Sequence, residues 1–163
     1  MTAQLSVDVQ VASSSGGVPP DENVQSWVAA VLNQLDYNDN VEISVRIVDE
    51  DESRGLNKVY REKDKPTNVL SFPSGIGDYA PDNEPRPLGD IVICAPVVEH
   101  EAALQGKDEG DHWAHLVVHG TLHLLGFDHE TDAEACAMEA IEREILAAHG
   151  VADPYAAREQ QSV

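Results

Sequence analysis

A chain of 163 residues is long enough to bury one hydrophobic core, so it suits a single domain. Its composition, 42% hydrophobic and 25% charged, is that of an ordinary globular protein, and no apolar run approaches the roughly 20 residues that a membrane-spanning helix needs. The formal net charge of -20 argues, taken alone, against a nucleic-acid-binding protein, because contacts to phosphates require lysine and arginine.

The predicted elements alternate between strands and helices. Apolar residues recur at every second position in the strands and at helical spacing in the helices. We expect strands at 5–12, 41–48, 68–72 and 88–95. We expect helices at 21–35, 49–61, 96–105, 111–125 and 132–149. Asp21 is expected to cap the first helix, and the second helix is expected to turn Leu56, Val59 and Tyr60 inward.

The order of these elements predicts the fold class. The alternation indicates an α/β (α+β) fold, a single layer domain with a mixed, about four-stranded sheet packed by about five helices. The strand at 88–95 is mostly apolar, which predicts a central place in the sheet. The proline-rich segment 74–87 is predicted to be a long loop. We assign the domain to residues 1–155 and a tail to residues 156–163.

Two features bear on location. Residues 1–8 have neither the basic region nor the apolar region of a secretory signal. Cys94 and Cys136 lie far apart and form no CxxC pair, so both thiols are expected to behave as small apolar groups. A reducing, cytoplasmic location without a membrane partner is therefore expected.

The basic residues are few but clustered. Five of the ten lie within residues 54–65, and we call them the basic strip: Arg54, Lys58, Arg61, Lys63 and Lys65. The acidic excess lies elsewhere, in residues 49–52, in residues 107–112 and in the C-terminal third. The strip could carry a single RNA strand along a groove, and the alternative is a solvated helix face.

Three histidines form the most specific motif, His119-Gly-Thr-Leu-His123-Leu-Leu-Gly126-Phe-Asp-His129. His119 and His123 are four residues apart on a predicted helix, so they lie on one face, one turn apart. Gly126 can take the left-handed conformation that ends a helix, which lets the chain turn and His129 return as a third ligand. The alternative is three unrelated histidines on a helix and its turn.

Three imidazoles with one open position are typical of a catalytic zinc site. We expect one Zn²⁺ per chain, and nickel or copper can bind the same ligands. Asp128 is expected to hydrogen-bond one of the ligand imidazoles. Zinc proteases share the spacing in the pattern H-E-x-x-H-x-x-G-x-x-H, but here Gly120 replaces the glutamate that serves as general base. The metal geometry is therefore expected to persist, while proteolysis is disfavoured.

Four segments resemble the YbeY family of bacterial RNA-processing metalloproteins. The segments are LNKVYREKDKPTNVLSF at 56–72, LGDIVICA at 88–95, HWAHLVVHGTLHLLGFDH at 112–129 and MEAIEREI at 138–145. They occur in the same order as in the family, and the resemblance covers most of residues 45–155. The resemblance implies a single-strand-specific endoribonuclease with a three-histidine zinc site and a nearby catalytic arginine, here Arg61. It also implies roles in maturing the 3′ end of 16S rRNA and other rRNA ends, and in ribosome quality control.

Several residues are candidates for binding the substrate. Arg61 would clamp a phosphate with its planar fork of donors. Lys58, Lys63 and Lys65 are candidates for RNA contacts, and His115 either lines the cleft or is a satisfied, partly buried histidine. The expected partners are single-stranded RNA or rRNA, and the ribosome or a small-subunit ribosomal protein, since so acidic a protein is expected to bind RNA weakly. A non-catalytic, zinc-stabilised ribosome-assembly factor is the second hypothesis, and a zinc protease is the third.

Overall fold

The computed structural model describes residues 5–37, 39–74 and 85–155. Within these ranges the four strands are β1 (Leu5–Val11), β2 (Val41–Val48), β3 (Val69–Pro73) and β4 (Arg86–Cys94). The five helices in the same ranges are α1 (Asp21–Gln34), α2 (Glu50–Arg61), α3 (Ala95–Gln105), α4 (Glu109–Leu124) and α5 (Asp132–Ala148). The predicted fold class is confirmed. Residues 75–84 of the predicted loop and the predicted tail lie outside the described residues.

The sheet is mixed and has the order β1-β2-β4-β3. Strands β1, β2 and β4 run parallel, and β3 pairs antiparallel with β4. The expected central place of β4 is therefore confirmed, and β3 is left as an edge strand. This edge matters for the site, because α4 packs beside β3.

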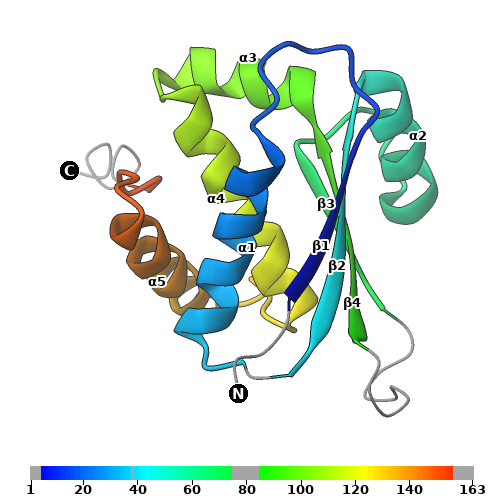
Figure 1. Ribbon diagram of the computed structural model, residues 1–163. Helices are drawn as coiled ribbons and strands as arrows, with labels where there is room; N and C mark the ends of the chain where they lie inside the picture. Colours follow the sequence, from blue (N-terminus) through cyan, green and yellow to red (C-terminus); the bar gives the residue numbers. More distant parts are fainter. Residues whose placement is uncertain (1–4, 38, 75–84, 156–163) are drawn as a thin grey trace.

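Helices cover the sheet unequally on its two faces (Figure 1). Helices α1 and α4 pack on one face, and α5 packs outside them; α2 lies on the other face. The core between the sheet and α1 and α4 includes Ile43, Ile91, Val28 and Trp113, all with at most 2% of their surface exposed. Burying each such side chain contributes about 1.5–3 kcal/mol, so this face anchors α4 firmly.

Helix α2 is attached by polar contacts and by Leu56, which packs partly buried against the core beside Leu70. Of the three residues expected to turn inward, only Leu56 does so. The buried residues of this helix are Ser53 and Asn57. The Ser53 hydroxyl donates to the carbonyl of Thr67 at 3.0 Å, and the Asn57 amide donates to the carbonyl of Lys65 at 2.8 Å. Val59 and Tyr60 are instead 73% and 63% exposed. The hydropathy pattern is misleading here because hydrogen bonds to the following loop orient the helix.

Three smaller findings complete the fold. Helix α1 begins at Asp21 with Pro20 in the capping position, so Asp21 adds charge to the first turn and is not the cap that we expected. Cys94 is buried, as expected for a small apolar group. Cys136 is exposed, so the prediction that this second thiol behaves as a small apolar group is wrong. Among the described residues, no helix combines the length and the apolar character that crossing a membrane requires.

Candidate metal centre and cleft

Helix α4 carries two of the candidate metal ligands and lies close against the sheet. Trp113 and Val117 are buried in the core below it. At Gly120 the helix approaches so closely that a Cβ atom would lie 3.0 Å from Cγ2 of Ile91. Position 120 therefore faces the sheet, and a glutamate there could not be accommodated without displacing the side chain of Ile91. This packing accounts physically for the glycine that stands where zinc proteases have their general base.

The three histidines of the motif come together at the end of this helix. Nε2 of His119 and Nε2 of His123 are 3.1 Å apart. Helix α4 ends at Leu124, and Gly126 has a φ of 100°, a conformation that residues with a side chain rarely adopt. The chain turns back there, and the His129 ring lies 5.6 Å and 5.0 Å from the rings of His119 and His123.

This arrangement fits a metal ion. One ligand atom from each of the three rings lies within 4.8 Å of the others. Burial lowers the pKa of His123, and the neighbouring His119 and His129 lower it further. His123 therefore stays neutral near pH 7 and keeps a lone pair for coordination. Imidazole nitrogens of this kind suit zinc, nickel and copper.

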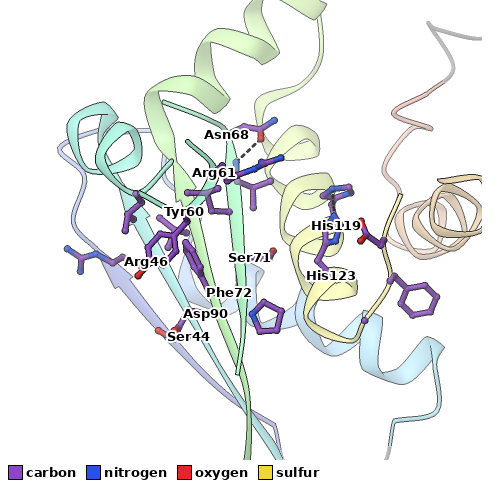
Figure 2. Close-up of a pocket in the computed structure, with 18 of the residues that line it drawn as sticks. Ser44, Arg46, Tyr60, Arg61, Asn68, Ser71, Phe72, Asp90, His119 and His123 are labelled. Carbon is purple, nitrogen blue, oxygen red and sulfur yellow. Dashed lines mark hydrogen bonds between the residues drawn. The ribbon is translucent and has the colours of Figure 1, made fainter. Parts of the chain in front are cut away.

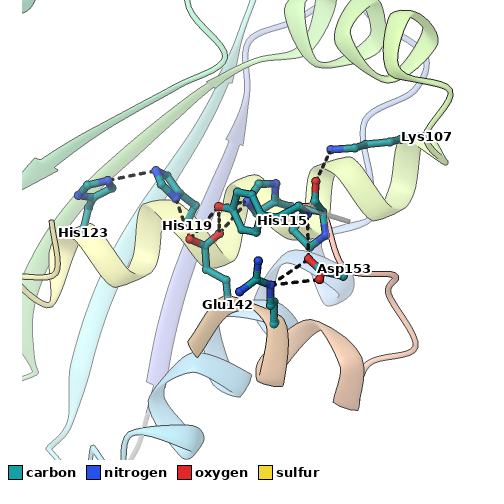
Figure 3. Close-up of polar contacts among 9 residues, drawn as sticks. Lys107, His115, His119, His123, Glu142 and Asp153 are labelled. Carbon is teal, nitrogen blue, oxygen red and sulfur yellow. Dashed lines mark hydrogen bonds and ion pairs between the residues drawn. The ribbon is translucent and has the colours of Figure 1, made fainter. Parts of the chain in front are cut away.

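A buried carboxylate from α5 supports the first of these histidines (Figure 3). Glu142 is fully buried, and its Oε1 lies 3.3 Å from Nδ1 of His119. Its Oε2 lies 2.6 Å from Nε2 of His115, and the Tyr155 hydroxyl donates to it at 3.0 Å. Burial raises the pKa of Glu142, but the contacts with His115 and His119 outweigh burial and bring the pKa to about 2. An ionised carboxylate only accepts, so Nδ1 of His119 carries the proton and Nε2 is free to bind a metal.

Glu142 is the residue of the site that we did not predict. A signal was available, because Met138, Glu142 and Ile145 occupy one apolar stripe of α5 and a lone carboxylate in such a stripe needs a partner. The expected contact between Asp128 and a ligand imidazole is absent: the Asp128 carboxylate accepts from the backbone N–H of His129 at 2.8 Å. It thereby shapes the turn that carries this histidine.

A cleft of about 1310 Å³ runs past the histidines and around the edge strand β3 (Figure 2). Arg61, at the end of α2, lines it together with His119, His123 and His129. In Figure 2, the side chain of Arg61 extends from the end of α2 across β3 towards the side on which the two labelled histidines lie. A cationic side chain and a candidate metal site thus face one space, which is suitable for an anionic group.

The other members of the basic strip lie elsewhere. Of the five residues, Arg61 is the only one that the structure places in the lining of this cleft. Arg54 instead makes two contacts to Asp64, at 2.7 Å and 3.1 Å. Lys58, Lys63 and Lys65 are exposed outside the cleft. The strip as a whole therefore does not line this cleft, although Lys58, Lys63 and Lys65 remain exposed to solvent.

His115 also lies outside the lining of this cleft. It lines a smaller cavity with Lys107 and Asp153, and its Nε2 lies 2.6 Å from Oε2 of Glu142. Of the two interpretations of this residue, the structure favours the partly buried histidine, but the residue is only partly satisfied, because its buried Nδ1 has no hydrogen-bond partner among the described residues.

Three comparisons with known proteins bear on this site. A family model described as "Endoribonuclease YbeY" matches residues 11–150. A relative of that name from Halorhodospira halophila is 56% identical over 145 residues, covering 89% of this chain and 93% of its own. Another, from Alkalilimnicola ehrlichii, is 54% identical over 160 residues, covering 96% and 94%. The solution structure of TM1509 from Thermotoga maritima matches with a TM-score of 0.53 at 24% identity, covering 85% of this chain and 89% of that one, which shows the fold alone.

Proposed function

The chain belongs to the endoribonuclease YbeY family and is thus a hydrolase that acts on RNA, and we propose that it is a zinc-dependent endoribonuclease specific for single-stranded RNA. One observation carries the proposal: three convergent imidazoles and an arginine line the same cleft. Phosphodiester cleavage requires charge stabilisation at a phosphoryl group, and this pairing of groups is suited to it.

The proposed metal ligands are His119, His123 and His129, holding one Zn²⁺ per chain, and nickel can replace it. When bound, the ion supplies Lewis-acid chemistry to the phosphoryl oxygen and the nucleophile. Glu142 holds the His119 ring in the tautomer and orientation that coordination needs. Because Glu142 is buried and anchored by α5, this orientation exists before RNA arrives.

The proposed catalytic residue is Arg61. Its guanidinium presents planar, paired donors that match two oxygens of a phosphate. From the end of α2 it reaches the cleft that the histidines line. The arginine would therefore stabilise the extra negative charge that develops on the phosphate in the transition state.

We place this activity in the cytoplasm, in maturation of the 3′ end of 16S rRNA and in ribosome quality control. The support is the family resemblance of the motifs together with the charge. A net charge of -20 repels long RNA and favours a basic partner, such as a small-subunit ribosomal protein, that delivers the substrate. Lys58, Lys63 and Lys65 would contact RNA outside the cleft.

A cleavage assay tests the proposal. The substrates are a short single-stranded RNA, the same RNA in a duplex, and casein. We expect zinc-dependent cleavage of the single strand alone, abolished by a chelator and by His123→Ala. Cleavage that persists in both cases would remove the metal from the mechanism. A zinc-loaded protein that cuts no RNA would favour the hypothesis of a non-catalytic assembly factor. Cleavage of casein would favour the zinc-protease hypothesis.

A further inference from the structure

The cleft has two chemically different parts, which lie on the two sides of β3 (Figure 2). Alternation along the strand separates them. The Ser71 hydroxyl points towards α4 and donates to the carbonyl of Gly120 at 3.2 Å, on the side of the histidines. Leu70 and Phe72 point to the opposite face, towards α2. The same cavity therefore continues from the histidines to a second region under the end of α2, and this second region has no role in the chemistry proposed above.

An aromatic pair dominates the second region. The rings of Tyr60 and Phe72 are 4.8 Å apart with an interplanar angle of 63°, an edge-to-face contact that favours one orientation of the Tyr60 ring. Tyr60 is nevertheless 63% exposed and lines the cleft. An exposed aromatic ring beside a cationic side chain is an arrangement on which proteins stack an unpaired base.

The charges of the second region select a base over a phosphate. Asp90 and Ser44 line it, and a carboxylate repels phosphate but accepts hydrogen bonds from the amino groups of bases. Arg46 also lines it, but Glu52 holds its guanidinium in contacts of 2.5 Å and 2.9 Å. The positive charge that a phosphate needs is therefore compensated on this side of β3, whereas Arg61 supplies it near the histidines.

We infer that Tyr60 and Phe72 form a binding site for one unpaired nucleobase of the substrate RNA, whose neighbouring phosphate lies between Arg61 and the histidines. The inference rests on the proposed function for the identity of the substrate. Tyr60 and Arg61 are adjacent in the chain, so one helix end would hold both the base and its phosphate. A base in a duplex cannot leave its stack without losing its pairing, so this subsite gives a physical reason for single-strand specificity.

The test is the binding of short RNAs to the protein as purified. A single-stranded RNA of about eight nucleotides carries the fluorescent base 2-aminopurine at each position in turn, and stopped-flow mixing records its quenching before any cleavage. A second series replaces the same position with an abasic site. The variants are Tyr60→Ala, Tyr60→Phe and, as a matched control, Val59→Ala. Val59 is 73% exposed on the same helix and lies outside the cleft lining. Metal content and thermal midpoint are measured for each.

We expect one position to be quenched in the wild type, with affinity about 10- to 100-fold weaker in Tyr60→Ala and for the matching abasic RNA. Tyr60→Phe and Val59→Ala should bind within about twofold of the wild type, since each retains the stacking ring. Wild-type affinity in Tyr60→Ala, or an abasic RNA that binds as tightly as the intact one, overturns the subsite, as does a wild type that binds no RNA. Cleavage of the same RNA by the wild type is scored separately. If the wild type binds RNA in a base-dependent way but does not cleave it, the proposed nuclease activity is contradicted and the base-binding site is still supported.

Discussion

The two walls of the cleft hold their side chains in different ways. The histidine wall, formed by His119, His123 and His129, is fixed from behind by the buried Glu142 and by the packed core under α4. The arginine wall, formed by Tyr60 and Arg61 at the end of α2, has exposed side chains. Its helix is attached to the fold through the polar contacts of Ser53 and Asn57 and the partly buried Leu56.

This difference separates two tasks. A metal site needs ligands that are preorganised before the ion binds, which requires burial and fixed hydrogen bonds. A group that acts on the substrate must remain accessible until the substrate arrives. Changes to the histidine wall should therefore alter metal binding, stability and activity together. Changes to the arginine wall should alter activity and RNA binding alone.

The largest effect is expected from breaking the histidine wall directly. In His119→Ala and His129→Ala, the site loses one of its three imidazoles, so bound zinc should be lost. Cleavage of RNA should fall by more than the ~10²–10³ that one charge-stabilising donor provides. Elemental analysis after gel filtration measures zinc per chain, and His100→Ala, exposed on α3, is the control. Full zinc occupancy in both variants would rule out the three-histidine site.

Breaking the arginine wall should separate activity from metal binding. We expect Arg61→Ala to keep its fold and its zinc but to lose about 10²–10³ in cleavage rate, because the clamp acts on the transition state. Arg61→Lys should restore part of the rate, since an ammonium lacks the bidentate fork. Single-turnover cleavage at matched zinc content measures both. Val59→Ala, exposed on the same helix but outside the cleft lining, should be close to the wild type. Wild-type rates in Arg61→Ala would exclude this residue from the mechanism.

A subtler change tests the support behind the histidine wall. Glu142→Gln keeps the shape of the side chain but removes the ionised acceptor that faces His119 and His115. Loss of such an outer partner typically weakens metal binding about 10- to 100-fold. Competition with a chromogenic chelator measures zinc affinity, with Glu134→Gln, exposed on the same helix, as the control. Unchanged affinity would show that Glu142 serves the fold and not the metal.

Removing the metal should lower stability by a moderate amount. A zinc ion bound by the three histidines would tie the turn after Gly126 back to α4, and a ligand at about 100 times its dissociation constant stabilises the native state by about 2.7 kcal/mol. For a domain of this size that corresponds to roughly 5–10 °C in the thermal midpoint. Calorimetry with and without chelator measures it, and His119→Ala should show no response to chelator. A midpoint that does not move once the zinc is gone would show that the site contributes no stability.

The same contrast explains what could be predicted from the sequence. The strand and helix order, the central β4 and the approach of the three histidines depend on local periodicity and on one short turn at Gly126, so covalent spacing nearly determines them. The prediction for the face of α2 holds for Leu56 but is wrong for Val59 and Tyr60. The orientation of this helix also depends on hydrogen bonds from Ser53 and Asn57 to a loop that only the folded chain brings near.

Contacts between segments that are distant in the sequence are also not predictable from sequence patterns. Glu142 meets His119 across two helices that are 23 residues apart at these positions, and no periodicity within either helix encodes that meeting. Clustering of the basic strip in the sequence likewise does not predict clustering at the cleft. A helix end and the loop after it disperse neighbouring side chains, and Asp64 neutralises Arg54.

The smallest effect is expected from the members of the strip that lie off the cleft. Lys58 and Lys63 can meet phosphates of RNA beyond the cleft, so Lys58→Ala with Lys63→Ala should weaken binding of a short RNA only a few-fold. For each phosphate that a lysine no longer neutralises, the slope of log affinity against log salt should fall by ~0.7 for a single strand. Because this variant also makes the protein more negative, the matched control is Ala133→Glu with Ala137→Glu, two exposed positions on α5 that give the same change in net charge. If the lysines touch RNA, only their variant changes the salt slope, since a slope counts displaced counterions and not overall repulsion. Equal slopes in the two variants would mean that the strip acts through net charge alone, and that Arg61 is its one member with a direct role.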